Sequence, residues 1–333
     1  MNSLTKNQLC ALLLITDMFG LCCMRGSIST ATLWGVLGGT AIQFLIALAF
    51  AVQGRGLSRA AEVFFLLYAV FCGGTVFSEL WQSSAVIYIP YESSRGVWGR
   101  LMTAGLVAAV CLYISSTGMK SAGRAAVIAA AVGISCLAID LASAAVNADW
   151  QNLWRPERRS TFAELIRGFA VSGGLGSFAV FLGEVRGDRV RTTVRYFAAK
   201  AVISAAVLLT ALAVAGGIMP VTDFPVITAA QLSQPFEAQR IDSLFLVVFS
   251  VFAVFSAALQ VMTGAFLLSR IFPSFRRWKS TAVILCTVGA ACLIWGRELL
   301  LLRGAGAAAA LVFAVISGKK ISAAKTADRY YSY

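Results

Sequence analysis

The stretch FAVSGGLGSFAVFLGE, from Phe169 to Glu184, is apolar enough to lie in a bilayer and carries a glycine cluster at its centre. Gly173, Gly174 and Gly176 each disfavour a helix by about 1 kcal/mol relative to alanine. Backbone groups freed by a helix break cannot face lipid, so a break here must line a cavity or be buried in protein. The stretch therefore predicts either one wall of a ligand site, as in the broken helices of secondary transporters, or a close helix contact made by small residues.

The composition around this stretch is that of a helical membrane protein. Of the 333 residues, 59% are hydrophobic and 13% are charged, about half the charged fraction of a soluble chain. The net charge of +13 does not predict nucleic-acid binding, because the basic residues lie between apolar runs rather than on one patch. Histidine is absent, which excludes a histidine-based triad or metal site, and the scattered cysteines predict neither a disulfide nor a metal site.

Ten apolar runs are long enough, or nearly so, to cross a membrane as helices. We therefore predict an all-α polytopic membrane protein with a single transmembrane domain over residues 1–318 and a basic cytoplasmic tail over 319–333. The ten predicted spans are residues 9–24, 32–52, 61–89, 98–115, 122–146, 162–185, 193–218, 241–271, 281–295 and 299–317.

The Lys and Arg residues set the predicted orientation. Most of the 28 fall on one side when the loops between the ten runs are assigned alternately to the two sides of the membrane. Because basic loops stay on the cytoplasmic side, we expect both termini to be cytoplasmic.

Ten spans divide into two sets of five, about residues 8–146 and 161–318, which we expect to form the inverted repeat of a leucine-transporter-like fold. The partner of the sixth span is then the first, where Asp17 and Gly20 interrupt an apolar run. We expect both spans to be broken and to cross at mid-membrane. The predicted ligand site comprises Asp17, Gly20, Ser172, Gly173, Gly174, Gly176 and Ser177.

This arrangement predicts a zwitterionic ligand. Helix N-termini carry positive partial charge and suit a carboxylate, whereas freed carbonyl groups and an acid suit an ammonium. An amino acid satisfies both. An aspartate at mid-membrane is costly and by default marks a ligand or proton site; the alternative is an Asp17 bonded to nearby hydroxyls such as Thr16.

Other polar residues in the runs are open to two readings. Glu79 and Asp140 belong either to a proton path or to interfacial structure. Lys200 is expected to reach the cytoplasmic face along its own stem, and the alternative is a role in the site. Glu164 and Arg167 are spaced for an i,i+3 pair. A further set, Gln43 and Gln260, suits hydrogen bonds between helices.

A family resemblance enters at the connector before the eighth span. Phe224-Pro225, a short amphipathic stretch, and then Arg240-Ile241-Asp242 before an aromatic and aliphatic run resemble the B subunit of nutrient germinant receptors of endospore-forming bacteria (GerAB-type permeases). The opening Thr5-Lys6-Asn7-Gln8 is similar to the family's Thr-x-x-Gln, and Trp34 with the glycines after it resembles its second-span entry. The ten-span layout fits along the whole chain.

The resemblance implies the amino acid–polyamine–organocation transporter fold and a receptor subunit in the spore inner membrane. It implies binding of an amino acid or similar small nutrient, and partnership with an A-type membrane subunit and a C-type lipoprotein. No cofactor and no enzymatic activity are expected. The alternatives are a proton-coupled amino acid permease that acts alone in the bacterial cell membrane, and a structural subunit whose pocket no longer binds.

Overall fold

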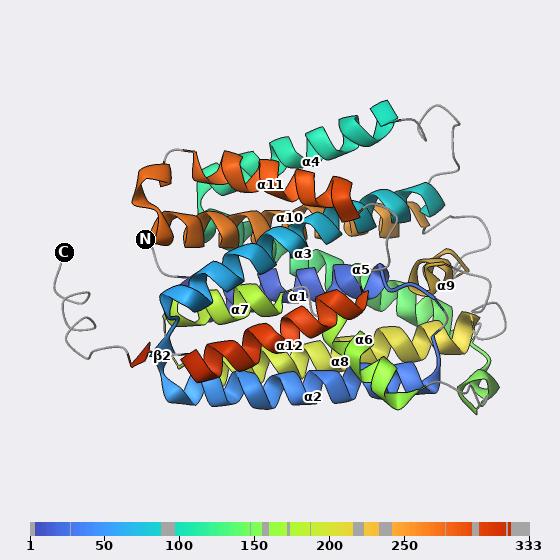
Figure 1. The fold of residues 1–333 in the computed structure, drawn as a ribbon. Coiled ribbons are helices and arrows are strands. Elements are labelled where there is room, and N and C mark those ends of the chain that lie inside the picture. Colours follow the sequence, from blue (N-terminus) through green and yellow to red (C-terminus); the bar gives the residue numbers. More distant parts are fainter. Residues whose placement is uncertain are drawn as a thin grey trace.

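The computed structural model is a bundle of helices that lie lengthwise beside one another, and the first described helix begins at the end of the bundle where the last one ends (Figure 1). It describes residues 4–26, 28–87, 97–146, 148–154, 160–171, 174–186, 188–215, 223–232, 242–276, 278–294, 300–317 and 319–320. The α-helices in that part of the chain are α1 (Lys6–Cys22), α2 (Thr30–Gln53), α3 (Arg59–Ile87), α4 (Val97–Thr117), α5 (Met119–Val146), α6 (Thr161–Val171), α7 (Leu175–Phe181), α8 (Arg189–Ala215), α9 (Pro225–Leu232), α10 (Asp242–Ile271), α11 (Lys279–Ile294) and α12 (Leu300–Ser317).

Short 3₁₀ turns and two strand pairs complete the described chain. The 3₁₀ turns are η2 (Trp150–Trp154), η3 (Leu182–Glu184) and η5 (Pro273–Arg276). Strand β1 (Leu4–Thr5) pairs in parallel with β3 (Val185–Arg186), and β2 (Arg55–Gly56) pairs antiparallel with β4 (Lys319–Lys320). The β1–β3 pair ties the segment before α1 to the segment that follows η3, and the β2–β4 pair ties the end of α2 to the segment that follows α12.

The chain is a multi-pass helical membrane protein by the length and composition of its helices. Among the described residues, five helices are long and apolar enough to cross a membrane, and a sixth span results if α6 and α7 are counted together. The segments Ala104–Thr117, Lys279–Ile294 and Leu302–Ile316 are apolar but shorter. Each of the ten predicted runs coincides with one helix or, for the sixth, with the α6–α7 pair; the ten-span count, the inverted repeat and the domain bounds stay predictions.

The sixth span is broken at the glycine cluster, as its sequence predicts. The segments Phe162–Val171 and Leu175–Glu184 are bent by 55° relative to each other. Ser172 and Gly173 lie outside the described residues. The glycine cluster therefore divides an apolar run into two short helices, α6 and α7, within the bundle.

The expected break in the first span is wrong. Helix α1 runs without interruption from Lys6 to Cys22, through Asp17 and Gly20. A lone glycine costs only about 1 kcal/mol, which the surrounding leucine-rich run and its packing outweigh. The helix begins at a capping box, in which Gln8 N donates to Thr5 Oγ1 and Thr5 N donates to Gln8 Oε1, and this explains the Thr-x-x-Gln opening.

Helix α1 is the centre of the bundle. Every residue from Ala11 to Cys22 is buried, and α1 packs against α5, α8 and α10. A helix that is apolar nearly all round is expected at such a position. Its one acid, Asp17, is therefore surrounded by protein on all sides.

Candidate functional site

The candidate site is built around the carboxylate of Asp17, which is 2% exposed. Its Oδ1 accepts a hydrogen bond from the backbone N–H of Gly174 at 3.4 Å, directly before α7. Its Oδ2 accepts from the hydroxyl of Tyr196 at 2.5 Å and lies 3.6 Å from Nζ of Lys200. The structure thus brings the acid of the first predicted span to the glycine cluster of the sixth.

Lys200 completes this cluster, and the expectation that it reaches the cytoplasmic face is wrong. Its side chain is 2% exposed, and Nζ donates to Oε1 of Gln43 on α2 at 3.0 Å. Tyr196 and Lys200 both project from α8 at i,i+4 spacing, so one helix face supplies two donors to Asp17. Because Asp17 and the side-chain oxygen of Gln43 both contact the Lys200 ammonium, the charge is compensated inside the bundle and does not need to reach water.

Asp17 is bonded to a hydroxyl, as the alternative expects, but the hydroxyl is that of Tyr196 and not that of Thr16. The Thr16 hydroxyl instead donates to the carbonyl oxygen of Leu12, one turn back in the same helix, at 2.9 Å. Asp17 therefore relies on α7 and α8 for its partners. The expectation that Gln43 forms a hydrogen bond between helices is confirmed, because it accepts from Lys200 of α8.

The remaining described residues of the predicted site contact different neighbouring helices. Ser177 shares a 2.7 Å hydrogen bond with Thr263 of α10. A Cβ on Gly176 would lie 2.8 Å from the ring of Tyr68, and one on Gly174 would lie 3.0 Å from Leu13. These residues pack α7 against α3, α10 and α1, so the close-packing interpretation of the glycines holds alongside the helix break.

Gly20 also serves close packing. A Cβ there would stand 2.5 Å from the carbonyl oxygen of Val171, the last residue of α6. The same Cβ would be 3.5 Å from Nη2 of Arg303, so the Arg303 guanidinium lies against α1 one turn beyond Asp17. Gly20 thus lets the end of α6 and the arginine of α12 approach the helix that carries Asp17.

Arg303 forms a second buried ion pair in this region. Its Nη1 lies 2.6 Å from Oε1 of Glu79 on α3, and the arginine is 3% exposed. The orientation predicted from the Lys and Arg residues counts Arg303 on the outer side, whereas α12 carries it into the bundle. A run that continues apolar on both sides of Arg303 is the signal for an intramembrane arginine with an acidic partner.

Asp140 has no such partner among the described residues. The residue is 5% exposed, and its Oδ1 is buried without a hydrogen bond. It lines two small apolar cavities of about 20 and 30 Å³, which lie against α8 and α10.

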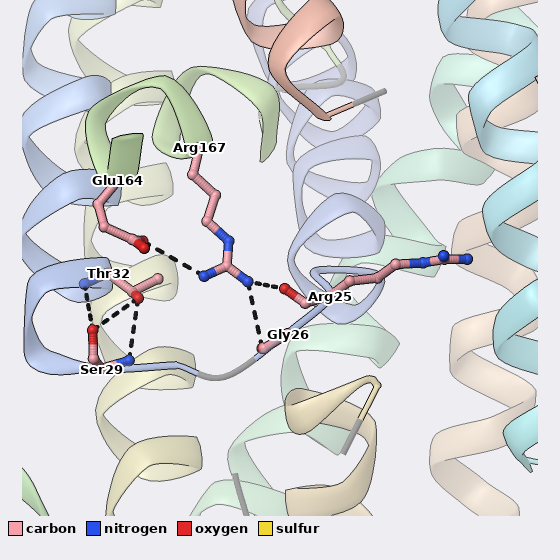
Figure 2. A network of polar contacts seen from close by, with 6 residues as sticks. All are labelled: Arg25, Gly26, Ser29, Thr32, Glu164 and Arg167. Atoms are coloured by element: carbon pink, nitrogen blue, oxygen red, sulfur yellow. Dashed lines mark hydrogen bonds and ion pairs between the residues drawn. The ribbon is translucent and has the colours of Figure 1, made fainter. Parts of the chain in front are cut away.

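A third polar network joins α6 to the connection between α1 and α2 (Figure 2). Arg167 forms the expected i,i+3 pair with Glu164 at 3.5 Å, and both are buried. Nη2 of Arg167 donates to the carbonyl oxygens of Arg25 and Gly26. Beside them, Ser29 and Thr32 form the capping box that starts α2. Arg167 therefore ties the first half of the broken span to the exit of α1.

Comparison with known proteins leaves the family open: no family model matches this chain, and no curated protein shows significant sequence similarity to it.

Proposed function

We propose that this chain is a permease-like membrane subunit that binds a small amino acid at the break between α6 and α7, as the B subunit of a nutrient germinant receptor. The observation that carries the proposal is the buried Asp17 carboxylate of α1, hydrogen-bonded to the Gly174 N–H beside that break. The resemblance of residues 219–246 to the germinant-receptor family supports the receptor role, although residues 216–222 and 233–241 lie outside the described chain.

The Asp17–Lys200 pair has the charges of the proposed ligand. An amino acid that enters between them would place its ammonium on Asp17 and its carboxylate on Lys200 and the Gly174 N–H. The site has no net charge either with or without the ligand, because a zwitterion is inserted into an ion pair. This matters in a membrane interior, where a net buried charge is expensive.

Ligand entry would also move helices. The direct contacts of Asp17 hold α1, α7 and α8 together in this structure. A ligand that replaces them favours a state in which these helices are further apart, and differential binding shifts the population toward that state. In a receptor, an A-type subunit and a C-type lipoprotein in the spore inner membrane would sense this shift.

The test is calorimetry on the purified receptor complex with a panel of amino acids. We expect binding that is lost in a D17N/K200M double variant, which removes both charges together. The matched control is Glu62→Gln: it removes the acid of an ion pair with Arg270, at 2.8 Å, away from the break. Loss of binding in both variants, or no heat from any nutrient in folded protein, would count against the proposal.

A proton-coupled permease that acts alone is the second candidate function. The buried Asp17–Lys200 pair favours it, because protonation of Asp17 would release the lysine. Reconstituted protein without partner subunits would then accumulate labelled amino acid in liposomes under a pH gradient. The receptor proposal predicts binding without such uptake.

A further inference from the structure

A cavity with polar walls lies away from Asp17, at the end of the bundle where α1 begins and α12 ends. Its volume is about 310 Å³, in the size range of small-molecule sites. The turn between α4 and α5, the end of α7, and the start of α11 border it. Figure 1 shows the α10–α11 connection at the same end as the N and C labels.

Two lysines give the cavity its charge. Lys120 and Lys279 both line it, and none of the described lining residues is acidic. Neither lysine side chain has an ion pair or hydrogen bond within the described part of the chain. The nearby acid Glu62 is already engaged by Arg270 at 2.8 Å. Two like charges on one cavity destabilise each other until an anion lies between them.

The positions of these lysines in their helices add to the positive potential. Lys120 is in the first turn of α5 and Lys279 is the first residue of α11. The first turn of a helix already carries positive partial charge, so a cation there is disfavoured and an anion is favoured. The 310 Å³ cavity provides the space for that anion between the two helix starts.

The other walls of the cavity show what kind of anion fits. Ser115 adds a hydroxyl group and shares a 2.7 Å hydrogen bond with Ser280, which leaves one hydroxyl hydrogen of the pair free to donate. The hydroxyl of Thr117, also in the wall, donates to the carbonyl oxygen of Ile114 at 2.8 Å. The opposite wall is apolar and includes Phe181, Met262 and Phe266. A ligand that meets cations and hydroxyls on one side and apolar side chains on the other is an anionic amphiphile.

We propose that this cavity binds the phosphate head group of an anionic membrane phospholipid, with its glycerol and first acyl carbons against the apolar wall. Basic pockets between helices at the cytoplasmic face are typical sites for such head groups. The predicted orientation places this end of the bundle on that face. The lipid would hold the starts of α5 and α11 together. The site is independent of the amino acid site at Asp17.

The test uses the full-length protein in detergent micelles, supplemented with phosphatidylglycerol, with phosphatidylcholine of the same acyl chains, or with inorganic phosphate. Thermal unfolding and native mass spectrometry are measured for the natural protein and for K120Q/K279Q. Arg124→Gln is the matched control, since Arg124 is exposed one turn further along α5 and does not line the cavity. K120R/K279R retains both charges and tests whether a loss comes from charge alone.

We expect phosphatidylglycerol to bind and stabilise the natural protein more than phosphatidylcholine does. Removing two cations at about fivefold each should weaken that binding roughly 25-fold in K120Q/K279Q, with Arg124→Gln and K120R/K279R little changed. Equal binding to K120Q/K279Q and to the natural protein would overturn the site. Equal stabilisation by inorganic phosphate would overturn the assignment to a lipid.

Discussion

At the residue scale, the Asp17–Lys200 pair is the most consequential contact in the bundle. Asp17→Asn leaves the Lys200 ammonium buried without its acid, and removing one partner of a buried pair typically costs about 3–5 kcal/mol. We expect a correspondingly lower unfolding temperature. D17N/K200M removes both charges and should recover most of the loss in a double-mutant cycle. Additive losses in the double variant would show that the two residues do not depend on each other.

Asp140 is the opposite kind of residue, a buried acid with no described partner. Asp140→Leu removes a buried carboxylate oxygen that lacks a hydrogen bond, and the adjoining cavities of about 20 and 30 Å³ accept the larger side chain. We expect a gain of about 1–3 kcal/mol in the free energy of unfolding. Glu79→Gln is the contrast, since Glu79 is paired with Arg303 and its loss should destabilise. A destabilised Asp140→Leu would contradict this account of Asp140.

At the element scale, glycines set how closely α2 and α6 approach. A Cβ on Gly35 would lie 2.5 Å from backbone atoms of Glu164, so Gly35→Ala must push the two helices apart. We expect a loss of about 1–3 kcal/mol, measured as a lower unfolding temperature in detergent. Gly289→Ala on α11 is the matched control, because nothing lies within 4 Å of its Cβ, and it should be neutral or slightly stabilising. Equal effects of the two substitutions would rule out close packing as the reason for Gly35.

The elements also show how far sequence reasoning reaches. Apolar runs predict where the helices lie, and the glycine cluster predicts the break between α6 and α7, because both depend on local composition. The same logic fails for α1, where one glycine is outweighed by packing that the local sequence does not contain. The predicted positions of Lys200 and Arg303 fail for a related reason. Their acidic partners, Asp17 and Glu79, come from distant segments, and periodicity within one run cannot identify a partner in another.

At the scale of the whole molecule, the charge distribution predicts how the bundle is oriented. Burial of Arg303 in α12 removes one cation from the outer side, which enlarges the cytoplasmic excess of Lys and Arg that the loops predict. Basic loops remain cytoplasmic, so the turn at Gly118 should face the cytoplasm and η2 the opposite side. In a cysteine-free background, we expect a membrane-impermeant maleimide to label Gln151→Cys in intact cells and Ser116→Cys, two residues before the turn, only after permeabilisation. Both residues are exposed. The reverse labelling pattern would place the two lysines of the cavity on the outer face of the membrane. The assignment of the cavity to an anionic lipid of the cytoplasmic leaflet would then lose its basis.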